Sequence, residues 1–244
     1  MKYAHKLLTC LALSGALLFS HAHAMSLLGT EPGRGTWVRT LHARDLNLDG
    51  ETDAFYDTAL DITWLRNAAY IYRQPWDIAV SAAADFEIGG FKHWRLSNMI
   101  DVGGDGCNFG SGTDCAFNPL TLSGGITYSE LAHLWYVTLG NRSTVSGPGG
   151  APALPDAGFV NVGGFQNFEI WFMWTGLKYA PDPDQAWYLG TEAGFQGAQR
   201  KSAGGLGMLV HDGDLRPVPL PGTALSLSGA LAVLLLRRRR AGLR

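Results

Sequence analysis

The sequence predicts an α+β domain with an antiparallel sheet and two helices, with one short apolar segment at each end of the chain. Segments of strand character stand before, between and after two segments of helical character, an order typical of α+β domains. Of the 244 residues, 46 % are hydrophobic and 11 % aromatic, so the chain can bury a core and is not a disordered protein. No interior stretch approaches the roughly 20 consecutive apolar residues of a membrane helix, which excludes a polytopic membrane protein.

The first half of the domain is predicted to contain two strands, a helix and a third strand. Alternating or β-branched residues predict the strands 36–42 and 59–65. Pro75 precedes a helix over 76–86, in which apolar and small residues share one face. Two glycines then separate this helix from a strand over 91–96.

The second half begins with a helix over 128–139. Thr127 and Glu130 have the spacing of a capping box at its start. A loop rich in Gly, Pro and Ser follows over about 143–164, and its length favours a binding surface or local mobility. The glycine-rich segment 204–207 is interpreted as a turn. Further strands are predicted over 168–174, 185–189 and 206–211.

Residues 1–24 have the order of a secretory signal peptide. Lys2 and Lys6 form a short positive segment, and residues 7–19 form an apolar segment of suitable length. The tripeptide 22–24, Ala-His-Ala, then supplies the small residues that signal peptidase needs. We therefore expect export with cleavage after residue 24, and the alternative is a buried first helix.

Residues 217–244 combine a proline-containing tetrapeptide, a short apolar segment and a run of arginines. The 14 residues of 223–236 would reach roughly 21 Å as a helix, short of a bilayer core of about 30 Å, so they suit a short transmembrane anchor. The arginines would stay on the cytoplasmic face. The residues of the tetrapeptide are Val218, Pro219, Leu220 and Pro221, and those of the arginine run are Arg237, Arg238, Arg239 and Arg240.

This tail resembles the PEP-CTERM sorting signal of Gram-negative bacteria, with Leu220 where that family often has Glu. The resemblance implies processing by an exosortase near the tetrapeptide, after transient anchoring in the inner membrane through residues 223–236. It also implies release to, or attachment at, the cell surface, often in bacteria that make exopolysaccharide. A plain C-terminal anchor is the alternative.

The domain between these segments, 25–216, is acidic. Two of the 19 basic residues lie in 1–24 and five in 217–244, so 12 remain against all 21 acidic residues, a net charge of about −9. This charge favours solubility and disfavours anionic partners, including nucleic acid.

Aromatic and structural motifs recur along most of this domain, over about 50–212. They are the segments Tyr56–Leu65, Gly89–Leu96, Glu130–Leu134, Trp174–Gly176 and Ala186–Tyr188. Their series resembles the Lcl C-terminal domain family, which implies an irregular C-type-lectin-like or formylglycine-enzyme-like α+β fold. The chain departs from that family at His93 and Ser97, where Asp and Pro are usual, and at 209–211, where Val-Arg-Pro is usual.

Cys107 and Cys115 are the two cysteines left after signal removal, since Cys10 lies within 1–24. An exported pair separated by a glycine-rich turn favours a structural disulfide, which would stabilise so short a loop by roughly 2.5 kcal/mol. The spacing is not that of a Cys-x-x-Cys redox pair.

The segment 45–53 resembles the first nine positions of an EF-hand calcium loop. Oxygen-bearing side chains alternate and Gly50 occupies position six, as a tight loop around Ca²⁺ requires. Position twelve is Tyr56 instead of Glu, so the alternative is a metal-free, Asx-rich turn between strands. No other cofactor is predicted. The candidate calcium ligands are Asp45, Asn47, Asp49, Glu51 and Asp53.

Glycan binding is a further candidate activity, because aromatic rings stack on sugar rings and carboxylates hydrogen-bond sugar hydroxyls. At least half of the rings over 171–188 are expected in the core, and strand alternation would place Trp171 and Phe172 on opposite faces. The candidate ligand-binding residues are Trp174, Tyr179, Trp187, Asp105 and Asp114.

No catalytic residues are predicted, because no nucleophile, base and orienting group assemble along the sequence. The leading hypothesis is an exported, non-enzymatic surface or matrix protein, sorted by an exosortase, that binds glycan or exopolysaccharide. One alternative is an enzyme on a formylglycine-enzyme-like scaffold that acts on extracellular polymer, and another is a purely structural matrix component. The histidines of the domain are scattered and are His42, His93, His133 and His211.

Overall fold

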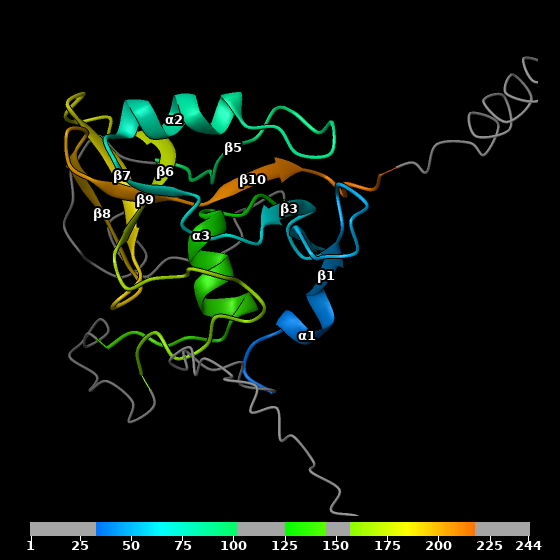
Figure 1. The fold of residues 1–244 in the computed structure, drawn as a ribbon. Coiled ribbons are helices and arrows are strands. Elements are labelled where there is room, and N and C mark those ends of the chain that lie inside the picture. The colour runs from blue at the N-terminus through cyan, green and yellow to red at the C-terminus, as the bar shows by residue number, and fades with distance from the viewer. Residues whose placement is uncertain (1–32, 102–124, 145–156, 218–244) are drawn as a thin grey trace, which may run out of the picture.

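The computed structural model describes residues 33–101, 125–144 and 157–217. These residues form the α+β architecture that the sequence predicted, but with two five-stranded sheets, one of them mixed, where a single antiparallel sheet was expected (Figure 1). None of the helices in this part of the chain is long and apolar enough to cross a membrane. The expected signal peptide, the sorting tail and the Cys107–Cys115 disulfide lie outside the described residues.

The first sheet is antiparallel throughout, with its strands in the order β1, β2, β3, β10 and β5. The bounds of these strands are, in the same order, Leu41–Arg44, Ala54–Asp57, Ile62–Leu65, Leu209–Asp212 and Arg95–Leu96. Although β10 comes after every other strand in the described chain, it lies inside the sheet, between β3 and β5.

The second sheet is mixed, with its strands in the order β4, β9, β6, β7 and β8. β6 and β9 pair in parallel through Met173 and Leu206, whereas the other neighbours are antiparallel. A bulge interrupts the pairing of β4 with β9 between Ile71 and Gln74. The strand bounds are Ile71–Gln74, Gly205–Gly207, Phe172–Lys178, Gln185–Gly190 and Phe195–Arg200.

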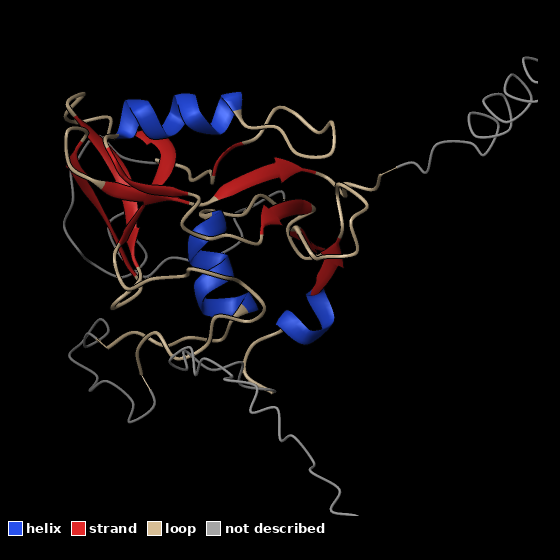
Figure 2. Ribbon diagram, viewed as in Figure 1, coloured by secondary structure: helices blue, strands red, loops and turns tan. Residues whose placement is uncertain are grey.

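Two helical segments pack on opposite faces of the second sheet (Figure 2). Helix α2, Trp76–Asp85, shares a hydrophobic cluster with Trp174. Helix α3, Glu130–His133, continues into the π-helical turn η1, Leu134–Thr138, and this helix shares another cluster with Met173. Because neighbouring residues of a strand point to opposite faces, Met173 and Trp174 place the two helices on opposite sides of β6.

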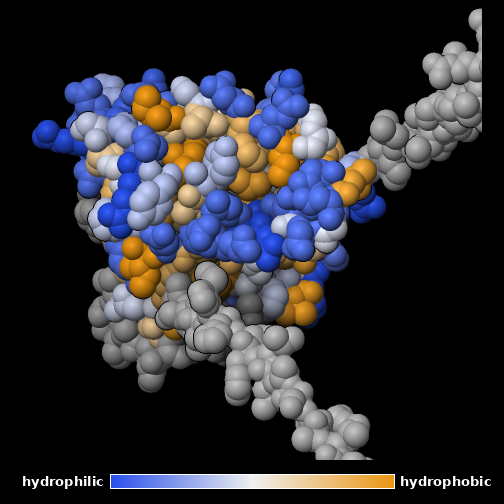
Figure 3. All heavy atoms as spheres, viewed as in Figure 1, coloured by the Kyte–Doolittle hydropathy of each residue, from blue (hydrophilic) through white to orange (hydrophobic). Residues whose placement is uncertain are grey.

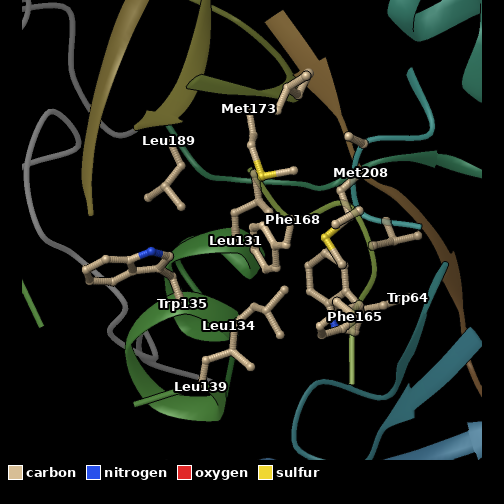
Figure 4. Close-up of a cluster of buried hydrophobic side chains, with 14 of the residues drawn as sticks. Trp64, Leu131, Leu134, Trp135, Leu139, Phe165, Phe168, Met173, Leu189 and Met208 are labelled. Atoms are coloured by element: carbon tan, nitrogen blue, oxygen red, sulfur yellow. The ribbon is translucent and has the colours of Figure 1, made fainter. Parts of the chain in front are cut away.

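The larger core cluster lies between the second sheet and the helix formed by α3 and η1 (Figure 4). The helix predicted over 128–139 is present, but its last turn is π-helical, because the amide of Leu139 donates to the carbonyl of Leu134 at 2.8 Å. The buried residues of this cluster include Trp64, Leu131, Leu134, Trp135, Leu139, Phe165, Phe168, Met173, Leu189 and Met208.

The strand predicted over 36–42 is wrong in its first half, where residues Trp37–Thr40 form the helical turn α1. The carbonyl of Thr36 accepts hydrogen bonds from the amides of Arg39 and Thr40 at 2.8 and 3.0 Å, which closes this turn before β1 begins. The partly buried Trp37 packs against the core cluster. Tertiary contact therefore overrides the β propensity of the segment.

The turn predicted over 204–207 is also wrong, because Gly205–Gly207 form strand β9. A Cβ at position 205 would lie 2.5 Å from the indole nitrogen of Trp174 and 2.6 Å from the ring of Phe172. Glycine at position 205 therefore allows β9 to pack closely against the aromatic side chains of β6. The single strand expected over 206–211 is divided into β9 and β10.

The capping box expected at the start of the second helix is not formed. Ser129 is the N-cap of α3, and its hydroxyl accepts a hydrogen bond from the amide of Ala132 at 3.2 Å. The carboxylate of Glu130 instead accepts two hydrogen bonds of 2.8 Å from the guanidinium of Arg95. This ion pair fastens α3 to β5.

Candidate functional site

The three aromatic residues that the sequence assigned to ligand binding are buried. Trp174 and Trp187 are 0 % and 1 % exposed, and Tyr179 is 8 % exposed. The indole N–H of Trp174 donates to the main chain of β4 at 3.0 Å, and that of Trp187 donates to the carboxylate of Asp101 at 3.2 Å. The structure therefore places these rings in the core instead of at a ligand surface. The two acidic candidates for ligand binding, Asp105 and Asp114, lie outside the described residues.

A different set of aromatic residues lines an open groove of about 330 Å³, referred to below as the aromatic groove. Phe172 and Tyr188 belong to the cluster that also contains α2, so the groove lies on the α2 face of the second sheet. Figure 3 shows hydrophobic side chains interspersed with hydrophilic ones over the visible face of the molecule, not gathered in one large patch. The lining residues are Ile170, Trp171, Phe172, Tyr188, Glu192 and Gln199.

Trp171 lies just before β6, and this position determines its orientation. Strand alternation predicted Trp171 and Phe172 on opposite faces, but β6 begins only at Phe172 and the two rings stack with centroids 5.6 Å apart. The main-chain amide of Trp171 donates to the hydroxyl of Thr191 at 2.9 Å, and its indole N–H donates to the carbonyl of Gly204 at 2.8 Å. These bonds hold the ring at the rim of the groove, where 36 % of the residue is exposed.

Arg73 of β4 covers part of the Trp171 ring. The guanidinium carbon lies 4.2 Å from the ring centroid, which is within cation–π distance. Arg73 has a positive φ of 49° and lies in the bulge of β4, a feature that redirects side chains. A non-glycine residue in this conformation costs roughly 1–3 kcal/mol, which the surrounding contacts must offset. The bulge therefore aims Arg73 at Trp171 and braces the ring.

Glu192 supplies the aromatic groove with a carboxylate. The residue is exposed, and its side chain makes no hydrogen bond or ion pair with any residue that the structure describes. A Cβ at Gly190 would come within 2.9 Å of the Glu192 carboxylate and 3.0 Å of the Phe195 ring, so glycine leaves room for both. Burial, and after it the charge of Glu192, raises the pKa of the Tyr188 hydroxyl.

A second groove, of about 570 Å³, lies at the start of α2 and carries charges of both signs. Gln185 donates to the carboxylate of Asp182 at 2.8 Å, and this hydrogen bond lowers the pKa of Asp182. The ammonium of Lys201 lies 4.9 Å from the ring centroid of Trp76. We place the candidate ligand site in the aromatic groove, because it combines aromatic rings with a carboxylate, that of Glu192, at one surface. The lining residues of this polar groove are Pro75, Asp77, Asp182, Asp184, Arg200, Lys201 and Ser202.

The predicted calcium loop is a turn between β1 and β2 that is closed by its own hydrogen bonds. Asp45 accepts from two amides of the loop at 3.2 and 2.9 Å, and Asp53 accepts from two others at 2.8 and 3.3 Å. The side-chain amide of Asn47 donates to the carboxylate of Asp49 at 2.9 Å, and the main-chain amide of Glu51 donates to the same carboxylate at 2.9 Å. Within the described ranges, no three His, Cys, Asp or Glu side chains are arranged to hold a metal ion. These hydrogen bonds are those of an Asx-rich turn.

A buried acid and a partly buried histidine lie together between β2 and η1. The carboxylate of Asp57, which is 0 % exposed, accepts hydrogen bonds from the amide of Ala59 at 3.0 Å and from the hydroxyl of Thr138 at 3.3 Å. The same hydroxyl lies 3.4 Å from Nδ1 of His133. Burial raises the pKa of Asp57 and lowers that of His133. Neither residue is among those that line the aromatic or the polar groove.

The two polar residues of the aromatic groove were not predicted from the sequence. Glu192 and Gln199 carry no local motif and stand in separate segments. The antiparallel register of β7 and β8 brings their segments together, with Gly190 opposite Phe195 and Ala186 opposite Gln199. Only this long-range pairing places the two polar side chains beside the aromatic rings.

Comparison with protein-family models, with curated proteins and with solved structures found no match. What the domain binds must therefore be inferred from its own residues.

Proposed function

We propose that this chain is an exported, non-enzymatic surface or matrix protein whose domain binds a glycan, such as exopolysaccharide, in the aromatic groove. The observation that carries the proposal is the position of Trp171, whose ring is held at the rim by two hydrogen bonds and by Arg73. A ring that is fixed before binding loses little conformational freedom when a sugar packs against the part that Arg73 and Phe172 leave exposed. Glu192 and Gln199 stand at the same groove, where they can hydrogen-bond sugar hydroxyls.

We also propose a C-type-lectin-like identity for the domain, on the resemblance of 50–212 to the Lcl C-terminal domain family. The α+β architecture, with two sheets of short strands, is compatible with this identity. Arg95 belongs to Gly89–Leu96, one of the segments that carry this resemblance, and it has a structural role. Its guanidinium joins β5 to α3 through Glu130 and to β10 through Asp212.

Export and sorting are proposed on the sequence of the two terminal segments, 1–24 and 217–244. The test is fractionation of the tagged full chain, and of a variant lacking 217–244, in a host that contains an exosortase. The full chain is expected at the cell surface in a shortened form, and the variant is expected to lose that location. Unchanged location and size after the deletion would refute the sorting proposal.

A glycan array with the full chain tests the binding proposal. Trp171→Ala is expected to weaken binding at least about tenfold, which corresponds to about 1.4 kcal/mol, because the exposed part of the ring at the rim is lost. Val38→Ala is the matched control, since it shortens a 63 % exposed apolar side chain on α1, outside the groove, and should leave binding unchanged. Failure of the wild-type chain to bind any glycan would favour a purely structural matrix role.

A further inference from the structure

Among the residues that line the aromatic groove, Glu192 is the one that carries a charge. We propose that the groove selects a glycan whose sugars carry a protonated amine, such as a deacetylated hexosamine, over N-acetylated, neutral or acidic sugars. This inference rests on the proposed glycan-binding function and adds the chemical class of the ligand.

The first argument is that the aromatic rings and the carboxylate of the groove both attract a positively charged ligand group. The exposed side chain of Glu192 has no hydrogen-bond or ion-pair partner among the residues that the structure describes, and it shares the groove with Phe172 and Tyr188. Aromatic faces attract cations through the ring quadrupole, and a carboxylate attracts an ammonium group directly. Both kinds of group therefore favour the same ligand charge.

The second argument concerns where an ammonium group would lie. The guanidinium of Arg73 lies against the Trp171 ring, but Arg73 is not one of the residues that line the groove. The lining residues therefore include no cation. An ammonium group would lie on the Glu192 side, against Phe172 and Tyr188, while the sugar ring contacts the rim formed by Trp171. Recognition of the charge and contact with the sugar ring are thus assigned to different residues of one site.

The third argument is that glycine keeps the polar atoms of the groove accessible. A side chain at Gly190 would displace the Glu192 carboxylate, which lies 2.9 Å from the position of its Cβ. Gly197 stands opposite Tyr188, and a Cβ there would lie 3.0 Å from the Tyr188 hydroxyl. Glycine at both positions therefore leaves the carboxylate and the hydroxyl uncovered by their strand neighbours.

The charge of the whole domain acts in the same direction. The net charge of about −9 over 25–216 repels acidic polysaccharides and attracts cationic ones before contact. Because this long-range attraction is screened by salt whereas close contacts in the groove are screened less, the two contributions can be separated by ionic strength.

The test is calorimetric titration of the full chain with three tetrasaccharides, made of glucosamine, N-acetylglucosamine or glucose, at a pH where the amine is protonated. At an ionic strength of about 0.15 M, the glucosamine tetramer should bind about tenfold more tightly than the other two. Glu192→Gln should remove this preference. Glu51→Gln, which neutralises an exposed carboxylate outside the groove, is the matched control and should retain it.

Equal affinity of the wild-type chain for all three tetramers would overturn the charge preference while glycan binding stands. A full preference in Glu192→Gln would likewise overturn the assignment to Glu192. Absence of binding to every tetramer, together with a blank glycan array, would overturn the proposed function itself. An unchanged urea denaturation midpoint for Glu192→Gln shows that its loss of preference does not come from unfolding.

Discussion

The loop over 45–53 and the aromatic groove both present carboxylates at the surface, yet they use them differently. In the loop, Asp45 and Asp53 accept hydrogen bonds from main-chain amides and so complete a turn. In the groove, Glu192 has no such partner within the described part of the chain. A carboxylate that satisfies its own backbone contributes to stability, whereas one left open beside aromatic rings is available to a ligand. The spacing of acidic residues in the sequence indicated the loop, and not Glu192, as a place where carboxylates could bind a ligand. The comparison teaches that the hydrogen bonds a carboxylate already accepts must be considered together with its position in the sequence.

The largest expected effect concerns a third carboxylate, that of Glu130, whose side chain is 14 % exposed and paired with Arg95. Arg95→Met should lower the free energy of unfolding by about 2–3 kcal/mol, because Glu130 would remain partly buried without its partner. Urea denaturation measures the change. Lys92→Met is the control, because its pair with Glu87 is exposed and should contribute less than about 0.5 kcal/mol. Equally small effects of both changes would show that solvent satisfies Glu130 as well as Arg95 does.

A crossed pair of variants tests the comparison directly. Asp53→Ala should lower the free energy of unfolding by about 1 kcal/mol, because the amide of the buried Leu46 loses its acceptor, and it should leave glycan binding unchanged. Glu192→Gln should change stability by less than about 0.5 kcal/mol and weaken binding of the amine-bearing glycan. Denaturation and calorimetry of both variants measure the four outcomes. If either variant lost both stability and binding, the distinction between the loop and the groove would fail.

The pH dependence of stability extends the comparison to carboxylates with opposite pKa shifts. Burial raises the pKa of Asp57, whereas the hydrogen bond from Arg44 lowers that of Asp214. The contribution of Asp57 is fully present below the ordinary value of 3.8 and is lost as pH rises through its folded pKa. The contribution of Asp214 is present above 3.8 and is lost as pH falls through its folded pKa.

Neutral variants at these two positions should therefore flatten different parts of the stability curve. Asp57→Asn should remove a loss of stability that occurs as pH rises above 3.8, and Asp214→Asn should remove one that occurs as pH falls below it. Urea denaturation between about pH 2 and 7 measures both slopes. Slopes of the same sign at the two positions would contradict the assignment.

The smallest expected effect is that of calcium on the 45–53 loop. Because the carboxylates of this loop already accept hydrogen bonds, we expect Ca²⁺ at about 1 mM to leave the denaturation midpoint unchanged, with Mg²⁺ as the control. Calorimetry on the full chain checks the same point. Measurable heat together with a higher midpoint would contradict this expectation and support the calcium ligands Asp45, Asn47, Asp49, Glu51 and Asp53.

Sequence patterns located elements best where the residue periodicity was complete. The helix predicted over 76–86 is α2, Trp76–Asp85, and the strand predicted over 185–189 is β7, Gln185–Gly190. The strand β2 was not predicted and contains no β-branched residue. The strands β4 and β8 were not predicted either, because most of β4 is exposed at a sheet edge and β8 contains no β-branched residue. Their formation depends on pairing with β9 and β7, which local sequence does not encode.

The aromatic groove was predicted only in part. The density of rings over 171–188 indicated the region, but the sequence favoured Trp174 and Trp187, which are buried. Which rings stay open depends on the start of β6 at Phe172 and on the hydrogen bonds that turn Trp171 toward the same side. These are tertiary features, and they place Trp171 and Phe172 on the same side, whereas strand alternation predicts opposite faces.

The place of β10 in the first sheet has a consequence for the order in which the domain assembles. In a chain exported from its N-terminus, β3 and β5 emerge well before residues 209–212, yet β10 is the strand that joins them. Pairing across such long sequence separations is slow, because the ends of a long loop must first come together. If the chain is exported as proposed, the first sheet would stay incomplete until nearly the whole domain had crossed the membrane. The chain would then remain easy to unfold during translocation and would gain its resistance to unfolding only at the end.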